Sequence, residues 1–391
     1  MIKKIFFTLF LFYCSFIAHA QNAKLSVYAT VSVITSGPGN ELYEKFGHTA
    51  IRVKDPLLNL DLIYNYGFID FNAPNFYLKF TRGYMNYTLA RYPFRYALKS
   101  AKRDKRWTKE QVLNFTQEEN NQVFAFLENN ARPENANYFY DPFFDNCATK
   151  PREIIKLVLG NNITFPSDSI VQNQSIRQLM NNEINVNTWG SLGINVALGS
   201  RLDQKATVEE TMFLPDYVFS VLENSTIKRD DQTVPLIKKT TTLLNFKEKE
   251  NNAVFLNPYL VFTLLLLFSC FITFKNYKNK TRSKWFDFLL FFSTGITGVL
   301  IIFLWFFTDH STAPNNFNFL WAFAPNVIVA FYIRKNNPPK WIIFYIYIVL
   351  TLIAVIPLIW LTGIQLYSPC IIPIILILIV RYLYLQKTLN G

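Results

Sequence analysis

Five runs of apolar residues occupy the last third of the chain, and they constrain its fold more than any other feature. They cover roughly residues 258–274, 285–307, 317–333, 341–361 and 369–385. A helix that crosses a bilayer needs about 17–25 residues, and all five runs are near this length, with the third at the lower limit. Backbone groups in lipid must be hydrogen-bonded within their own segment. The sequence therefore predicts an all-α domain of five transmembrane helices over residues 256–391.

The loops between these runs predict how the helices are oriented. Residues 275–284 hold five basic side chains and residues 334–340 hold three, whereas residues 308–318 and 362–368 hold none. Basic loops remain on the cytoplasmic side of a bacterial inner membrane. The alternation predicts a cytoplasmic C-terminus and a periplasmic location for the chain that precedes the first helix.

A signal peptide at residues 1–20 predicts the same orientation independently. Lys3 and Lys4 form its charged region, an apolar stretch follows from residue 5 to residue 17, and Ala18-His19-Ala20 matches a cleavage site. We therefore expect residues 21–255 to form an exported soluble domain.

The net charge of +12 is unevenly distributed along the chain. Residues 21–255 carry 27 basic and 25 acidic side chains, whereas residues 256–391 carry ten basic and two acidic ones. The excess therefore lies beside the apolar runs, where positive charge sets topology. We expect the membrane to be the partner of these residues, and we expect no binding of nucleic acid.

The exported domain has the pattern of an α+β fold. Runs of β-branched and aromatic residues predict strands, and apolar stripes behind capping residues predict helices. The expected strands cover residues 24–35, 46–54 and 61–71, and the expected helices cover residues 108–130 and 145–159. Residues 225–252 are polar and predict a strand-poor linker to the membrane. The aromatic residues of the segment 76–96 either line a groove for an acyl chain or belong to the core.

Cys147 and His48 are the side chains of the exported domain best suited to nucleophilic chemistry. They are the only cysteine and the only histidine of residues 21–255. Cys147 lies at the expected start of a helix, where unpaired N–H groups favour a thiolate, and a histidine would accept the thiol proton. Singly, such a cysteine is usually a small buried hydrophobe and such a histidine is usually structural. Their joint presence favours a catalytic Cys-His pair.

Pro151 leaves two alternatives for the helix that follows Cys147. Either the helix begins at Cys147 and is kinked one turn later, or it begins near Lys150 and Cys147 lies in the preceding turn. The second alternative weakens the effect of the helix on the thiol and leaves the pairing with His48 intact.

A third group is expected to orient the imidazole of His48. The second and third expected strands form a hairpin around residues 55–60, so that position 48 lies opposite positions 66–67. Asn65 and His48 point to the same face of the sheet if the residue numbers of two directly opposite residues, one from each strand, sum to an odd value. Asp70 is the alternative candidate, and Asn65 is preferred.

The order of these residues resembles that of a known group of enzymes. His48 precedes Cys147 by 99 residues, the reverse of the papain order. This arrangement resembles the circularly permuted papain-like (NlpC-like) group, which includes lecithin:retinol acyltransferase-like enzymes. The resemblance implies a permuted papain-like fold for the soluble domain.

Four segments resemble the Lnb lipoprotein N-acyltransferase family more closely. They are Gly-Pro-Gly-Asn-Glu-Leu-Tyr-Glu-Lys-Phe-Gly-His-Thr-Ala-Ile-Arg-Val (37–53), Tyr-Asn-Tyr-Gly-Phe-Ile-Asp-Phe (64–71), Phe-Asp-Asn-Cys-Ala-Thr (144–149) and Met-Phe-Leu-Pro-Asp-Tyr (212–217). The resemblance implies a thiol acyltransferase with His48 and Cys147 as its catalytic pair. It further implies a phospholipid acyl donor and a diacylated lipoprotein acceptor, whose lipidated N-terminal cysteine receives the acyl chain on its α-amine.

Two other functions remain open at this stage. A membrane-anchored cysteine peptidase or amidase acting on cell-wall peptide would use the same pair with water, although it needs one anchor and not five helices. A non-catalytic membrane scaffold would tolerate the loss of Cys147. No cofactor is expected, because the exported domain has no His-x-His or Cys-x-x-Cys pattern that would indicate zinc.

Overall fold

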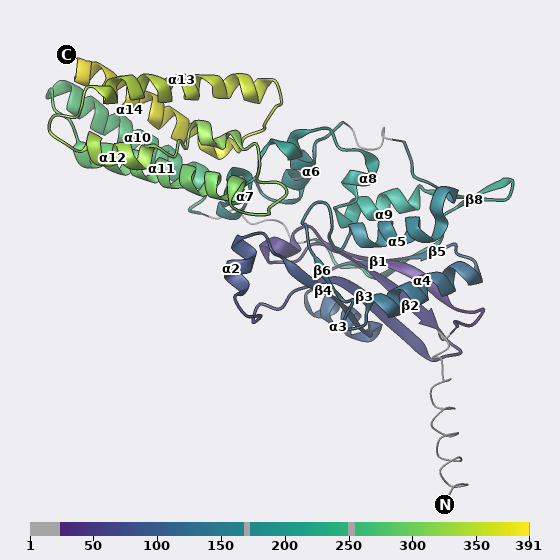
Figure 1. Ribbon diagram of the computed structural model, residues 1–391. Coiled ribbons are helices and arrows are strands. Elements are labelled where there is room, and N and C mark those ends of the chain that lie inside the picture. The colour runs from purple at the N-terminus through teal and green to yellow at the C-terminus, as the bar shows by residue number, and fades with distance from the viewer. Residues whose placement is uncertain (1–23, 168–172, 249–254, 391) are drawn as a thin grey trace, which may run out of the picture.

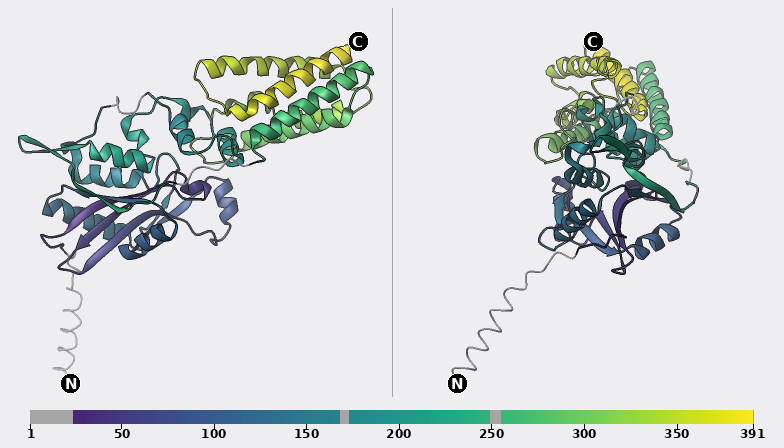
Figure 2. Two further views of the ribbon diagram at one scale, coloured as in Figure 1. Left: turned by 180° about the vertical axis from the view of Figure 1, so that it is seen from behind. Right: turned by 90° about the vertical axis from the view of Figure 1, so that its right-hand side faces the viewer.

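The computed structural model describes residues 24–167, 173–248 and 255–390 of the protein. The expected signal peptide at residues 1–20 lies outside these described residues. A soluble α+β domain comes first, and a bundle of long helices extends from one end of it (Figures 1 and 2).

The soluble domain is built on a seven-stranded antiparallel sheet. The strand order is β10-β5-β1-β2-β3-β4-β6. The strands are β1 (Thr30–Ser36), β2 (His48–Asp55), β3 (Leu60–Phe68), β4 (Asn86–Pro93), β5 (Thr108–Leu113), β6 (Asn137–Phe139) and β10 (Ile237–Leu244). A second sheet joins β7 (Ile163–Thr164), β8 (Thr226–Arg229) and β9 (Gln232–Pro235).

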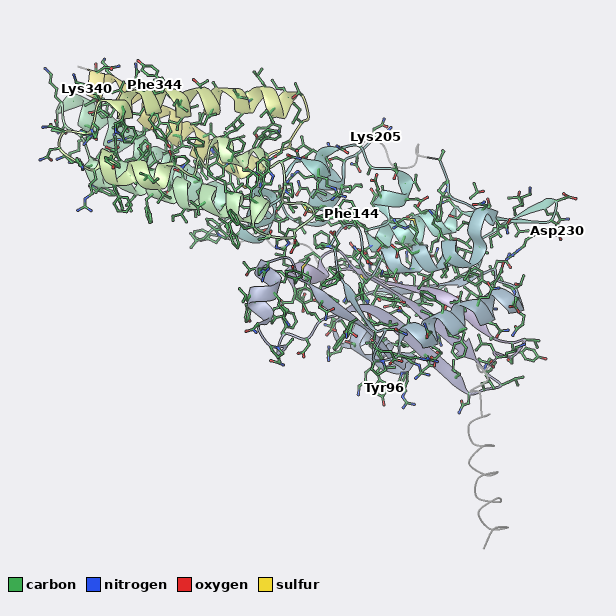
Figure 3. All side chains as sticks on the ribbon, in the orientation of Figure 1. Tyr96, Phe144, Lys205, Asp230, Lys340 and Phe344 are labelled. Atoms are coloured by element: carbon green, nitrogen blue, oxygen red, sulfur yellow. The ribbon has the colours of Figure 1, made fainter. Side chains whose placement is uncertain are left out.

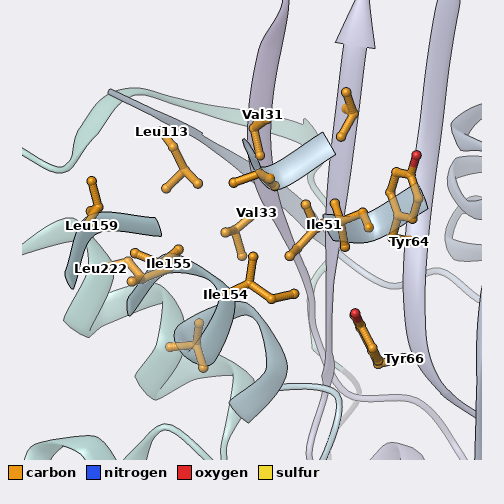
Figure 4. Close-up of a cluster of buried hydrophobic side chains, with 14 of the residues drawn as sticks. Val31, Val33, Ile51, Tyr64, Tyr66, Leu113, Ile154, Ile155, Leu159 and Leu222 are labelled. Carbon is orange, nitrogen blue, oxygen red and sulfur yellow. The ribbon is translucent and has the colours of Figure 1, made fainter. Parts of the chain in front are cut away.

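Helices cover both faces of the main sheet, because alternate strand residues point to opposite sides. One face packs against α4 (Gln117–Asn130), α5 (Thr149–Leu159) and α9 (Pro215–Glu223), and the other packs against α3 (Phe94–Arg103). In β2, Ile51 and Val53 face the first group of helices, whereas Ala50 faces α3. Figure 4 shows the larger core, where Ile154 and Ile155 of α5 meet the strands.

Two expectations for the secondary structure of this domain were wrong. Residues 108–130 are not one helix: Thr108–Leu113 is the strand β5, which pairs with β1 and β10, and only α4 is helical. The helix α4 begins at Gln117, where the side chains of Thr116 and Glu119 cap its first turn reciprocally. Residues 225–252 contain β8, β9 and β10, and β10 forms an edge of the main sheet.

A helical lobe lies between the sheet and the bundle. It contains α6 (Ile176–Glu183) and α7 (Trp189–Ala197), packed around Phe143, Leu179 and Phe213. The short helix α8 (Val208–Thr211) follows, and its Val208 belongs to the core of the main sheet. At its centre, the guanidinium of Arg177 donates to the carboxylate of Asp203 over 2.8 Å, and the two side chains are 0% and 1% exposed. Asp203 also accepts the backbone N–H of Leu366, which precedes the last helix of the bundle. This ion pair therefore connects the lobe to the bundle.

Backbone hydrogen bonds join the lobe to the loop of the bundle between Phe306 and Phe317. The N–H of Gly199 donates to the carbonyl of Thr312 over 2.7 Å, and that of Ser200 donates to the carbonyl of Asn315 over 3.0 Å. A Cβ atom on Gly199 would lie 1.8 Å from the carbonyl oxygen of Pro314, so this close approach requires glycine. The contact fixes the soluble domain against the bundle.

The bundle contains four helices long and apolar enough to cross a membrane, as far as the described residues extend. They are α10 (Pro258–Lys278), α11 (Lys284–Phe306), α13 (Trp341–Leu361) and α14 (Ile372–Asn390), the last preceded by the short helix η6 (Pro369–Ile371). Asp287 of α11 and Arg381 of α14 form an ion pair of 2.5 Å with both side chains fully buried. This buried ion pair joins α11 to α14.

The third expected span, residues 317–333, is not a continuous transmembrane helix. It forms the short helix η5 (Phe317–Leu320), a turn, and α12 (Asn326–Ile333), which has eight residues and lies along α11. Eight residues extend a helix by only about 12 Å, against the roughly 30 Å of a bilayer core. Pro325 stands at the break, where its ring removes a backbone donor and prevents a helix from continuing through it.

Candidate active site

Two neighbouring strands bring His48 and Asn65 together. β2 and β3 pair antiparallel, with Asp55 opposite Leu60 at one end of the paired region and Ile51 opposite Tyr64 at the other. These residue numbers sum to an odd value, as the shared face of His48 and Asn65 requires. The hairpin expected around residues 55–60 is therefore confirmed. The paired register stops before His48, so the two strands separate at the end of the sheet where the histidine lies.

A hydrogen bond fixes the orientation of the imidazole. Nε2 of His48 lies 2.7 Å from Oδ1 of Asn65, and Nδ2 of Asn65 donates to the hydroxyl of Tyr92 over 2.9 Å. Because Oδ1 can only accept, Nε2 carries a proton, and Nδ1 is the basic nitrogen of the neutral ring. The ring therefore presents a base on its other side.

Cys147 reaches that base from the turn that leads into α5. The side chain of Asn146 holds this turn: its Oδ1 accepts the N–H groups of Ala148 and Thr149, and its Nδ2 donates to the carbonyl of Phe213 over 2.9 Å. Asn146 thus fixes the turn that precedes α5, whose N-cap residue is Ala148. α5 itself starts at Thr149, so Cys147 lies in the preceding turn, in agreement with the second alternative for Pro151.

Cys147 and His48 shift each other's pKa in opposite directions. Burial would raise the pKa of the Cys147 thiol, but the charge and hydrogen bond of His48 and the backbone N–H groups of Thr49 and Cys147 together lower it. Burial would likewise lower the pKa of His48, but the charge and hydrogen bond of Cys147 and the bond from Asn65 raise it. Both shifts favour a thiolate paired with an imidazolium.

Gly67 and three tyrosines surround the thiol. Gly67 lies at a β-bulge between β3 and β4, and its φ of +90° is a conformation that glycine adopts without strain. A Cβ added there would lie 3.5 Å from Cβ of Cys147. Burial and the charge of Cys147 raise the pKa of Tyr87 to about 12, and they also raise the pKa values of Tyr138 and Tyr140. These phenols therefore remain neutral and add no charge that would oppose a thiolate.

A small cavity lies on the α3 side of the histidine. Its volume is 130 Å³, and His48, Asn65, Tyr92 and Arg106 are among the residues that line it. Burial lowers the pKa of Arg106 from its usual high value, and its Nε donates to the carbonyl of Gly37 over 2.7 Å. Space therefore exists beside the base for a polar group of a substrate.

The other sequence-predicted candidate does not join the site. Asp70 lies exposed beyond the end of β3, and its carboxylate accepts the N–H of Asn72 over 2.9 Å. Among the described residues, no group of three or more His, Cys, Asp or Glu side chains is placed to hold a metal ion.

Sequence reasoning missed several residues that build the site. Asn146 has a detectable signal, because an Asn with a Thr three residues later is typical of a helix cap, and Thr149 does accept the N–H of Asn146. Tyr92 and Gly67 gave no local signal: their roles depend on the register and the bulge between β3 and β4.

Two family models match the chain. Residues 18–182 match the Lnb N-terminal periplasmic domain, and residues 249–389 match the Lnb transmembrane domain. Searches of the curated proteins and of the solved structures returned no match. The two matches together cover both parts of the chain, including His48, Asn65 and Cys147. The protein therefore belongs to the Lnb family, as a membrane protein with a periplasmic N-terminal domain.

Proposed function

We propose that the protein is a lipoprotein N-acyltransferase in which Cys147 carries the acyl chain as a thioester. The observation that carries this proposal is the arrangement Cys147–His48–Asn65, in which the 2.7 Å bond to Asn65 orients an imidazole that is coupled to the thiol. A nucleophile, a base and an orienting group are the parts that covalent acyl transfer requires.

In the first half-reaction, the Cys147 thiolate attacks the ester carbonyl of a phospholipid. A carbon–sulfur bond forms, and the tetrahedral oxyanion accepts a hydrogen bond from a backbone N–H, for which those of Thr49 and Cys147 beside the sulfur are the candidates. The carbon–oxygen bond then breaks, and the imidazolium of His48 gives its proton to the departing lysophospholipid. The products are a thioester and a neutral histidine.

In the second half-reaction, the α-amine of a diacylated lipoprotein attacks the thioester. His48 takes a proton from the attacking nitrogen while the carbon–sulfur bond breaks. An amide forms, and the thiolate and imidazolium are restored. The neutral phenols around Cys147 favour this outcome, because they do not compete with the thiolate for the imidazolium.

The fold and topology support this reaction at a membrane surface. We propose that the soluble domain is a permuted papain-like fold, since a strand carries the base and the turn before a later helix carries the nucleophile. We also propose that the C-terminus and the basic loops are cytoplasmic. Lys340 lies at the end of the bundle away from the soluble domain (Figure 3), which supports this orientation. A reporter active only in the cytoplasm, fused at Gly391, would contradict it by remaining inactive.

The decisive experiment combines lipoprotein analysis with trapping of the intermediate. Mass spectrometry of lipoprotein N-termini should show loss of the amide-linked acyl chain in Cys147→Ser and His48→Ala cells. Purified wild-type protein incubated with labelled phospholipid should acquire label that hydroxylamine removes, because thioesters are cleaved by it. Cys270→Ser is the matched control, since Cys270 is an exposed thiol in α10.

Each rival function predicts a different result. An amidase would release peptide products and leave lipoprotein N-termini unchanged when Cys147 is replaced. A scaffold would show no labelled intermediate, and Cys147→Ser would have no consequence. Unchanged N-termini in cells with Cys147→Ser would refute the acyltransferase.

A further inference from the structure

The helix α2 (Phe76–Thr81) is rich in aromatic and apolar residues, and none of them is fully covered by the described parts of the chain. Its sequence is Phe-Tyr-Leu-Lys-Phe-Thr, yet none of its residues is buried against the parts of the chain that the structure describes. Tyr77 is 78% exposed, and Leu78 is 61% exposed. Phe71, just before the helix, is 55% exposed. The aromatic residues here do not belong to the core, and a contiguous apolar surface of this kind marks an interaction site.

The chain directly after α2 is bound to the outer end of the bundle. The N–H of Asp309 donates to the carbonyl of Arg82 over 2.9 Å. Asp309 follows the end of α11, where Phe306 and Phe307 are 66% and 69% exposed. Figure 1 shows α2 at the edge of the soluble domain that faces the bundle. The helix therefore lies at the level where α11 leaves the membrane.

Aromatic side chains lie along the chain between α2 and the thiol. The ring of Tyr84 lies 6.4 Å from that of Phe139, and the rings of Tyr87 and Tyr140 are stacked 4.1 Å apart. The charge of Cys147 reaches both Tyr87 and Tyr140, since it raises their pKa values. From the other direction, β3 runs from the bulge at Gly67 into the loop that precedes α2. Aromatic side chains thus lie both beside α2 and beside the nucleophile, and β3 and β4 run between the two places.

The charges of this region suit a lipid surface. Lys79 is exposed on α2, and the guanidinium of Arg82 lies 5.2 Å from the ring centre of Tyr84. Aromatic rings with basic side chains are typical of segments that lie in the headgroup layer, where the rings enter the acyl region and the cations meet phosphate. A lipid surface fits better than a protein partner, because the segment is already held beside a transmembrane helix.

We propose that residues 71–84, the interfacial segment, insert into the outer leaflet of the membrane and guide a phospholipid acyl chain along the aromatic contacts to Cys147. The first half of this proposal concerns membrane contact alone. The second half rests on the proposed acyltransferase function and names the route by which its lipid donor arrives.

Membrane contact is tested by the depth of a spin label in lipid nanodiscs. The label is placed by Leu78→Cys in a background that carries Cys147→Ser and Cys270→Ser. Tyr96→Cys is the matched control, because Tyr96 is 53% exposed on α3, away from the bundle (Figure 3). We expect the label at position 78 to be accessible to oxygen and shielded from a water-soluble nickel chelate, and the label at position 96 to show the reverse. Equal access to the chelate at both positions would overturn membrane contact.

The route is tested by Leu78→Glu with Tyr96→Glu as control. Thioester formation from bilayer phospholipid should fall by about tenfold or more, because a carboxylate is unfavourable in the acyl region. Alkylation of Cys147 by a small water-soluble reagent should be unchanged, which shows that the site is intact. Normal thioester formation in Leu78→Glu would overturn the route. If wild-type protein forms no thioester at all, the acyltransferase proposal fails, while the depth measurement still decides membrane contact. Shielding of position 78 from both probes would instead indicate a protein partner and overturn the inference.

Discussion

Replacing Asn65 by alanine tests the orientation of the catalytic base. The substitution removes the acceptor of the 2.7 Å bond from Nε2 of His48 and leaves the thiol and the imidazole in place. Without this bond, the ring can rotate, and the nitrogen that faces Cys147 is no longer fixed as the basic one. We therefore expect slower thioester formation in a protein that still folds.

The size of the effect follows from the kind of hydrogen bond. When His48 is an imidazolium, the bond to Asn65 is charge-assisted, and such bonds contribute about 1.5–3 kcal/mol. If the transition state loses this amount of stabilising free energy, thioester formation slows by roughly 10- to 150-fold. Tyr92→Phe removes only the neutral bond that positions Asn65, so its effect should stay below about tenfold.

A single-turnover assay measures this effect directly. Purified protein in nanodiscs is mixed with labelled phospholipid, and the hydroxylamine-sensitive label on Cys147 is followed over time. Asp70→Ala is the control, since Asp70 is exposed and bonded to Asn72, and its rate should equal that of wild type. A rate for Asn65→Ala within about twofold of wild type would mean that Asn65 does not orient the base, because this difference is below the value of one hydrogen bond.

Four further predictions concern the same machinery. His48→Ala should shift the alkylation profile of Cys147 to higher pH, because burial, which raises the thiol pKa, is then no longer outweighed by the histidine; an unchanged profile would show that the two are uncoupled. The rate of thioester formation should fall when the pH drops through the lowered pKa of Cys147, because the thiolate is then lost. The rate should also fall when the pH rises through the raised pKa of His48, because the imidazolium is then lost. A rate independent of pH would contradict the ion pair. Gly67→Ala should reduce the unfolding free energy by roughly 1–2 kcal/mol, measured by thermal unfolding in detergent, because alanine is strained at positive φ. Arg177→Met should cost about 3–5 kcal/mol in the same assay, since it leaves the carboxylate of Asp203 buried without its partner, and a neutral result would contradict that role.

Local sequence patterns predicted the part of the site that depends on one hairpin. The turn at residues 55–60 sets the register of β2 and β3, and counting from it places His48 and Asn65 on one face. Tyr92 could not be reached in this way, because it comes from β4, beyond a bulge that no local pattern announces. The nucleophile was found by elimination, as the only cysteine of the exported domain, and not by geometry.

The failed expectations share a physical cause. Residues 108–113 carry a pattern that resembles a helix cap, yet they form β5, because pairing with β1 and β10 outweighs local preference. β10 itself was hidden by its polar composition, which an edge strand with a solvent-facing side tolerates. The run 317–333 was judged by hydropathy alone, although Pro325 interrupts its helix.

The backbone contact between Gly199 and the loop at Thr312 holds the soluble domain, and with it the thiol, at a fixed position relative to the bundle. A domain held in this way cannot move toward an amine that lies far from the bilayer. The α-amine of a lipidated cysteine, by contrast, is confined by its own acyl chains to a thin layer at the headgroups. In the proposed reaction, the enzyme would then select acceptors by distance from the bilayer, without reading their sequence. Synthetic acceptors with polar spacers of increasing length between lipid and amine test this selection by distance. An abrupt loss of acylation beyond one spacer length would support it, and a gradual decline would argue against it.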